Sequence, residues 1–231
     1  MIDPFKRPKT GPITFDAGGT VLLCEGFDEC AVLRKLCADW APAPKIGVCQ
    51  EGLDYADEIK DLATQVKMHQ VAAIGLVFDA EGNRARRVDE IKKWLTKAGF
   101  KPPQGPLRLR KSSLGDALVQ VAYLVNPHGK ERGAIESYFL PQICRTKHWC
   151  CIDELLRCYE EREPSKVLRE KLIVRTFIAH RNGRNTGLNA AFNAGILDCS
   201  DASLNPVRRF VALLREAQLE SPKAASPSRT R

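Results

Sequence analysis

The sequence predicts an α/β protein with a mostly parallel sheet flanked by helices and a helical C-terminal part. From about residue 13 to residue 100, short apolar runs alternate with segments of helical periodicity, and such alternation is typical of right-handed βαβ units. Beyond Gly133 the pattern is helical almost to the end. The 231 residues suit one large domain or one domain with an appended part. We divide them into a flexible arm (1–12), an α/β domain (13–145), a helical extension packed on it (146–220) and a disordered basic tail (221–231).

The strand–helix units follow one another with clear local signals. Asp28 and Glu29 stand at the start of the first helix, where acidic side chains complement the helix dipole. Apolar residues share one face of the second helix, and Gly99 fits the C-cap of the third. We expect strands at residues 21–24, 46–49 and 71–78 and helices at residues 27–40, 55–69 and 88–98.

After Pro102 and Pro103 the alternation of strand and helix patterns ends. Residues 107–111 alternate with a period of two, and residues 117–125 form an apolar run rich in valine. This pattern predicts a hairpin or an edge pair added to the sheet. Further helices are expected at residues 134–144, 151–161, 165–180, 186–194 and 203–218.

Composition and charge restrict the classes of protein. No apolar run approaches the roughly 20 residues that span a bilayer, and the first residues lack the apolar segment of a secretory signal, so we expect a cytoplasmic protein. Lys and Arg outnumber Asp and Glu by 36 to 28, a net charge of +8, which indicates a polyanionic partner. Much of this excess lies in the arm and the tail.

The nine cysteines could serve as buried reduced thiols or as zinc ligands. Four of them fall inside apolar strand or helix patterns, where a thiol behaves as a small hydrophobic group. We expect reduced core cysteines at Cys24, Cys30, Cys37 and Cys49. The alternative for the others is a zinc site, whose soft ligands would be Cys144, His148, Cys150, Cys151 and Cys158, although their spacing matches no paired Cys-x-x-Cys pattern.

Two of the predicted strands end in carboxylate residues. Glu25 follows the first strand, and Asp79 and Glu81 follow the third. Parallel strands deliver such residues to the carboxyl edge of the sheet, and residues two positions apart in extended geometry point to the same side. Carboxylates gathered there would repel one another without a cation, and Mg²⁺ or Mn²⁺ suits oxygen ligands. These residues therefore predict a divalent-metal site, with loop acids that only cap helices as the alternative.

The order and spacing of the two acidic motifs resemble the Toprim domain of topoisomerases, bacterial primases, the 5S ribosomal RNA maturase and the overcoming-lysogenization-defect (OLD) nucleases. The chain is more similar to small stand-alone Toprim-like proteins of unknown function related to the OLD group. The similarity spans about residues 20–215 and includes Ile135-Glu136-Ser137-Tyr138 and the segment 189–214.

This resemblance implies a Toprim-like (Rossmann-like) fold and a Mg²⁺-dependent nuclease that hydrolyses phosphodiester bonds in DNA or RNA, in bacterial defence or nucleic-acid processing. Asp79 and Glu81 would hold the metal, and Glu25 would be a ligand or a general acid/base. Glu136 matches a further acid of the family. The usual second motif is Asp-x-Asp, so the longer Glu81 puts metal affinity in question. We expect direct hydrolysis, because covalent Toprim mechanisms need a tyrosine from another domain.

Basic residues at several places could contact a phosphate chain. The predicted set is Arg84, Arg86 and Arg87 after the second acidic motif, Lys111 on the edge strand, and Arg181 and Arg184 in a helix connection. An edge-strand lysine also serves simply to prevent aggregation. We expect the protein to bind DNA or RNA and not a membrane. A homodimer and a partner protein encoded nearby are both compatible with the sequence.

Two other functions compete with the nuclease. One is a nucleic-acid or nucleotide binding module whose Toprim-like site has degenerated. The other is a phosphatase of the haloacid-dehalogenase type, because residues 13–21 resemble the first motif of that family, with Asp16 as the nucleophile. Gly18 stands where those phosphatases place their general acid.

Overall fold

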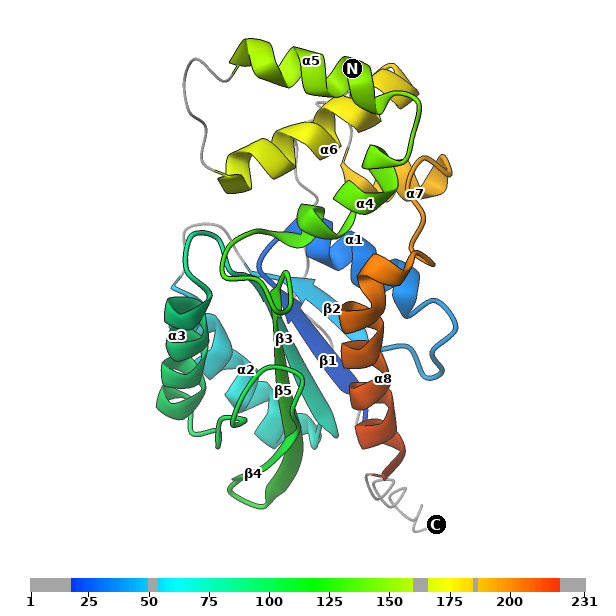
Figure 1. Ribbon diagram of the computed structural model, residues 1–231. Helices are drawn as coiled ribbons and strands as arrows, with labels where there is room; N and C mark the ends of the chain where they lie inside the picture. Colours follow the sequence, from blue (N-terminus) through cyan, green and yellow to red (C-terminus); the bar gives the residue numbers. More distant parts are fainter. Residues whose placement is uncertain (1–17, 50–53, 160–165, 185–186, 221–231) are drawn as a thin grey trace, which may run out of the picture.

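The computed structural model describes residues 18–49, 54–159, 166–184 and 187–220, and its centre is a five-stranded sheet (Figure 1). The strand order is β2-β1-β3-β5-β4. Neighbouring strands are parallel, except that β4 is antiparallel to β5. The strands are β1 (Thr20–Cys24), β2 (Lys45–Val48), β3 (Ala73–Asp79), β4 (Arg110–Leu114) and β5 (Ala117–Asn126). The predicted α/β fold class, with a mostly parallel sheet, is confirmed.

The predicted hairpin is present, but its two strands hold different places in the sheet. β4 is an edge strand, whereas β5 pairs in parallel with β3 and lies in the interior. Every residue of β5 except Leu118 is buried. Strands buried on both faces have near-continuous apolar sequences, and this explains the composition of β5.

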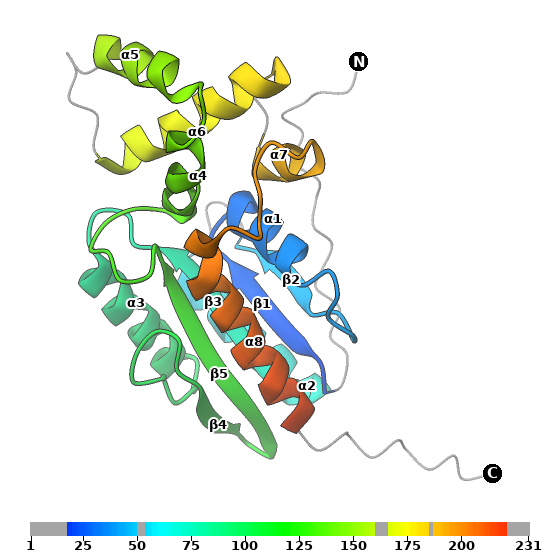
Figure 2. The same ribbon diagram turned by 45° about the vertical axis from the view of Figure 1, so that its right-hand side comes forward.

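Helices cover both faces of the sheet. α2 (Tyr55–His69) and α3 (Arg84–Lys97) pack on one face, while α1 (Phe27–Leu36) and α8 (Asn205–Glu220) pack on the other. Figure 2 shows α8 in front of the sheet, running alongside β1 and β5. Successive residues of a strand point to opposite faces, so a single apolar strand such as β1 contributes to both cores.

Gly75 of β3 allows α8 to lie close to the sheet. A Cβ atom at this position would be 2.4 Å from Leu214 Cδ1, 2.7 Å from Leu22 Cδ2 and 2.9 Å from Phe210 Cζ. A glycine inside a strand often marks such a close approach. The predicted helical extension therefore packs on the sheet through its last helix.

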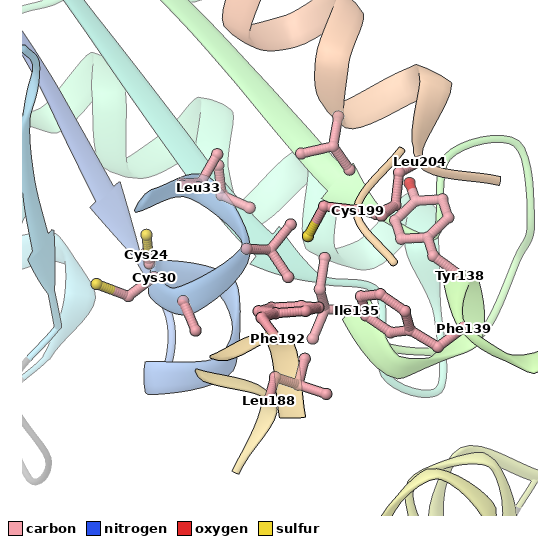
Figure 3. Close-up of a cluster of buried hydrophobic side chains, with 14 of the residues drawn as sticks. Cys24, Cys30, Leu33, Ile135, Tyr138, Phe139, Leu188, Phe192, Cys199 and Leu204 are labelled. Carbon is pink, nitrogen blue, oxygen red and sulfur yellow. The ribbon is translucent and has the colours of Figure 1, made fainter. Parts of the chain in front are cut away.

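The remaining helices lie beyond the carboxyl ends of the parallel strands (Figure 1). They are η1 (Ile135–Tyr138), α4 (Leu140–Cys144), α5 (Trp149–Tyr159), α6 (Lys166–Asn182), α7 (Leu188–Asn193) and η3 (Ala202–Leu204). Figure 3 shows the apolar cluster that joins this part to α1, in which Leu33, Ile135 and Phe192 take part. The ring centroids of Phe139 and Phe192 are 5.6 Å apart in this cluster. These contacts hold the helical part over the carboxyl edge of the sheet.

Some helix boundaries differ from the predicted ones for local reasons. α3 begins at Arg84, four residues before the predicted start, because the Asn83 side chain accepts a hydrogen bond from the Arg86 N–H (3.0 Å) and caps the helix. α1 ends at Leu36 instead of Trp40, shortly before a proline at position 42.

The expected core cysteines are buried, and all nine cysteines, each of which lies in a described segment, are free thiols. None of the helices among the described residues combines the length and the apolar character that a membrane span requires.

Candidate functional site

The parallel register places the ends of β1 and β3 side by side. Cys24 is opposite Val77, and the Glu25 N–H donates to the Val77 carbonyl oxygen (3.0 Å). The Glu25 carboxylate accepts a hydrogen bond from the Asp79 N–H, 2.8 Å from Oε2. Two of the predicted acids, Glu25 and Asp79, therefore meet at the carboxyl edge.

The other carboxylate oxygen of Glu25 is held by two donors. Arg87 Nη2 lies 3.1 Å from Glu25 Oε1, and the Tyr55 hydroxyl lies 3.2 Å from the same atom. Arg87 Nε also donates to the Asp79 carbonyl oxygen (2.9 Å), and its guanidinium lies over the rings of Tyr55 and Phe78. Glu25 is thus a fixed carboxylate that orients the end of β3.

Asp79 is the centre of a buried acidic cluster. Asp79 is only 4% exposed, and its Oδ1 accepts a hydrogen bond from the Ile135 N–H at 3.0 Å. The Asn126 amide lies 3.5 Å from the same oxygen. The carboxyl groups of Asp79 and Glu29 are hydrogen-bonded to each other, and Glu136 is close enough for its charge to act on both. We call Asp79, Glu29 and Glu136 the inner acids.

The inner acids all resist ionisation. Burial raises the pKa of Asp79 well above its usual value, and the negative charges of Glu29 and Glu136 raise it further. Burial raises the pKa of Glu29 to about 7, against the hydrogen bond with Asp79, and the charge of Glu136 adds to the rise. The pKa of Glu136 is also raised, first by burial and then by the charge of Asp28. The nearby cations Lys171 and Arg175 lower the pKa of Glu136 but do not offset its burial.

The first turn of α1 carries two acids to this edge. Glu29 approaches the helix N-terminus so closely that a Cβ atom at Gly26 would lie 2.9 Å from Glu29 Oε2. Asp28 accepts a hydrogen bond from the Leu188 N–H (3.2 Å) and forms an ion pair with Arg175 of α6. A side chain at Gly26 would thus displace the Glu29 carboxylate from its present position.

Glu81 lies beyond the end of β3, so its backbone does not have the extended geometry on which its predicted side-chain direction rests. β3 ends at Asp79, and Glu81 has a φ of +48°, in the left-handed region. Its backbone N–H and carbonyl both bond to Gly133, each at 2.9 Å. Its Oε1 lies 3.0 Å from Lys171 Nζ. The period-two rule assumes an extended strand and therefore does not apply at Glu81.

Helix α6 brings basic residues to the acidic edge. Lys171 pairs with Glu81, and Arg175 pairs with Asp28. Burial alone would lower the pKa of Lys171, but the hydrogen bond to Glu81 and the nearby charge of Asp79 raise it. The outer acids Glu25, Glu81 and Asp28 therefore each have a cationic partner.

The residues present fit a hard divalent cation in donor chemistry and in charge. Glu136 is 3% exposed and Asn126 is fully buried, yet Glu136 Oε2 and Asn126 Oδ1 have no hydrogen-bond partner in the described part of the chain. Buried oxygens without a donor are unfavourable unless a cation or water satisfies them. In the present arrangement no three His, Cys, Asp or Glu side chains among the described residues surround a common point. The inner acids would have to rotate to enclose a cation.

The predicted zinc ligands likewise form no group of three that could hold a metal ion among the described residues. Cys144, Cys150, Cys151 and Cys158 are exposed. His148 instead contacts His180 and Arg181, with 3.2 Å between the nitrogen atoms in each pair.

The predicted phosphate-binding residues divide into two groups. Arg84 and Arg87 face the protein: Arg84 Nη1 donates to the carbonyl oxygens of Val125 and Pro127, each at 2.9 Å, and Arg87 holds Glu25. The second group is exposed to solvent and consists of Arg86, Lys111, Arg181 and Arg184. Asp16, the nucleophile of the phosphatase alternative, lies outside the described residues.

Sequence reasoning did not name Glu29, Lys171 or Arg175 as site residues of this edge. Glu29 was interpreted only as a complement to a helix dipole, although it is buried in the first turn of α1. Lys171 and Arg175 are also four residues apart, which puts them on one face of α6. Their spacing could have indicated a shared surface, but the sequence does not show what that surface contacts.

No curated protein and no solved structure matches this chain. The model of one family, described as a protein of unknown function (DUF3226), matches residues 19–217. This match covers β1 to α8, including every acid of the carboxyl edge. The chain belongs to this family of unknown function.

Proposed function

We propose that the protein is a divalent-metal-dependent phosphodiesterase that acts on DNA or RNA. The observation that carries the proposal is the buried cluster of inner acids at the carboxyl edge, with unpartnered oxygens on Glu136 and Asn126. Open α/β folds bind their ligands at this edge, and acids with raised pKa values are typical of functional sites. The Toprim resemblance of the two acidic motifs supports the same reaction class.

The side chains divide into holding, orienting and proton-transfer roles. Asp79 and Glu136 would hold the cation, and Asn126 Oδ1 lies beside them. A bound Mg²⁺ or Mn²⁺ would neutralise phosphate oxygens and lower the pKa of an attacking water. Glu25 keeps Asp79 in position through the Asp79 N–H. Glu29, whose pKa is about 7, can accept a proton from that water near neutral pH.

Metal binding and cleavage test the proposal together. Protein stripped with EDTA would be titrated with Mn²⁺ by calorimetry and incubated with single-stranded and duplex DNA and RNA in Mg²⁺ or Mn²⁺. Asp79→Asn and Glu136→Gln should lose both binding and cleavage. Glu154→Gln, on the exposed side of α5, is the matched control and should behave as the wild type. A wild type that binds no Mn²⁺, or acidic-edge variants that cleave equally well, would refute the proposal.

A binding module without catalysis is the second candidate. It is favoured by the ion pairs of Lys171 and Arg175, which already compensate part of the acidic edge. Such a module would retard nucleic acid in a gel without added metal, and its affinity would fall as salt rises. Cleavage that depends on Asp79 would exclude it.

A further inference from the structure

We propose that a divalent cation at the acidic edge and Lys171 of α6 compete for the Glu81 carboxylate, so that cation binding breaks the ion pair between Lys171 and Glu81. This inference rests on the proposed metal site. It adds a coupling between that site and helix α6.

The ion pair is formed but open to exchange. Lys171 Nζ is 3.0 Å from Glu81 Oε1, and the side chains of Lys171 and Glu81 are 35% and 44% exposed. Pairs with this exposure are weak, because water screens the charges and competes for the same atoms. A divalent cation held by Asp79 would attract the Glu81 carboxylate more strongly than one ammonium group does.

The backbone at Glu81 is fixed while its carboxylate is not. The two hydrogen bonds to Gly133 hold Glu81 in the left-handed region, where a residue other than glycine is uncommon. Such outliers persist only where the surroundings impose them, and they concentrate at functional sites. Rotation of the side chain alone can therefore move the carboxylate between partners without changing the chain path.

The rest of α6 has contacts that do not depend on Lys171. Glu170 is buried and accepts a hydrogen bond from the Ser137 hydroxyl. Arg175 pairs with Asp28. Lys171 can thus leave Glu81 while α6 stays attached, and by linkage any cation that displaces Lys171 must bind more tightly once Lys171 is removed.

The affinity for Mn²⁺ measures this competition. Lys171→Met should bind Mn²⁺ roughly 3- to 10-fold more tightly than the wild type. Lys171→Arg keeps the charge and should remain within about twofold of the wild type. Lys97→Met, at an exposed position in the last turn of α3, removes one positive charge elsewhere and should also stay within about twofold. Equal or weaker binding by Lys171→Met would overturn the inference.

A second measurement follows the lysine directly in the wild type. The NMR signal of the Lys171 ammonium, assigned by its absence from Lys171→Arg, should move towards that of a free lysine as Mg²⁺ saturates the protein. A signal that does not move during saturation would overturn the inference. If the wild type binds no Mn²⁺, the metal site and the coupling both fail. If binding depends on Asp79 but not on the residue at position 171, only the coupling fails.

Discussion

Replacing Glu29 by glutamine should stabilise the metal-free protein at pH 8. Burial raises the pKa of Glu29 from the usual 4.5 to about 7, a difference of about 2.5, and one pKa unit corresponds to about 1.4 kcal/mol. Ionised Glu29 therefore destabilises the folded state by up to about 3 kcal/mol above pH 7. Glutamine has the same shape and no charge. Its weaker hydrogen bond to Asp79 offsets about 1 kcal/mol of the gain.

The sign of the pH dependence follows from the raised pKa. A carboxyl group whose pKa is higher in the folded state binds its proton more tightly there, so its contribution to stability is complete below about pH 4.5 and is lost as pH rises to about 7. The raised pKa values of Asp79 and Glu136 act in the same direction. The metal-free wild type should therefore be less stable at pH 8 than at pH 5, and Glu29→Gln should reduce this difference.

Urea unfolding in EDTA, followed by tryptophan fluorescence at pH 5 and pH 8, measures the effect. A gain of 2 kcal/mol corresponds to roughly 4–8 °C in the melting temperature of a domain of this size. Glu154→Gln controls for the loss of a surface carboxylate. An identical pH dependence in the wild type and Glu29→Gln would show that Glu29 carries no buried charge, and the assignment of the inner acids would be wrong.

Further predictions concern packing, the Glu25 contact and metal. Gly75→Ala should lower the free energy of unfolding by about 3 kcal/mol, because the added methyl group overlaps the α8 side chains; Gly105→Ala, with open space around it, should change it by less than about 1 kcal/mol in the same urea experiment. Arg87→Met should cost about 2–3 kcal/mol, because it leaves the largely buried Glu25 carboxylate without its cation; the exposed Arg86→Met is the control, and equal losses would contradict the role of Arg87. Mg²⁺ at 100 times its dissociation constant should stabilise the wild type at pH 8 by about 2.7 kcal/mol, and no rise in melting temperature would contradict the metal site.

Local patterns were sufficient to predict most of the fold. The βα alternation predicted α2 at its observed bounds, and the hairpin signal located β5, whereas β4 begins three residues after the start of the predicted strand. The sequence did not show that β5 inserts beside β3 or that α8 is the helix of the C-terminal part that packs on the sheet. Both depend on contacts between distant segments, such as Gly75 with Leu214 and Phe210, and no local signal carries that information.

The candidate site, like the fold, was predicted only in part from the sequence. The sequence predicted that Glu25 and Asp79 would meet if their two strands were neighbours, and the pairing of β1 with β3 supplies that condition. The side-chain direction of Glu81 was predicted from extended geometry, which does not hold there because the strand ends two residues earlier. Glu136 came only from the family resemblance, since an acid in a short 3₁₀ helix has no distinctive local pattern.

The distribution of partners among the acids locates the position that needs a cation. The outer acids are compensated within the protein: Glu25 by Arg87, Glu81 by Lys171 and Asp28 by Arg175. The inner acids contact one another and the backbone, and Glu136 Oε2 has no hydrogen-bond partner among the described residues. Two of the three compensating cations come from α6, so the helical part that follows β5 is needed to balance the edge of the sheet. The charge left uncompensated lies around Asp79, which is where a divalent cation would stabilise the folded protein most.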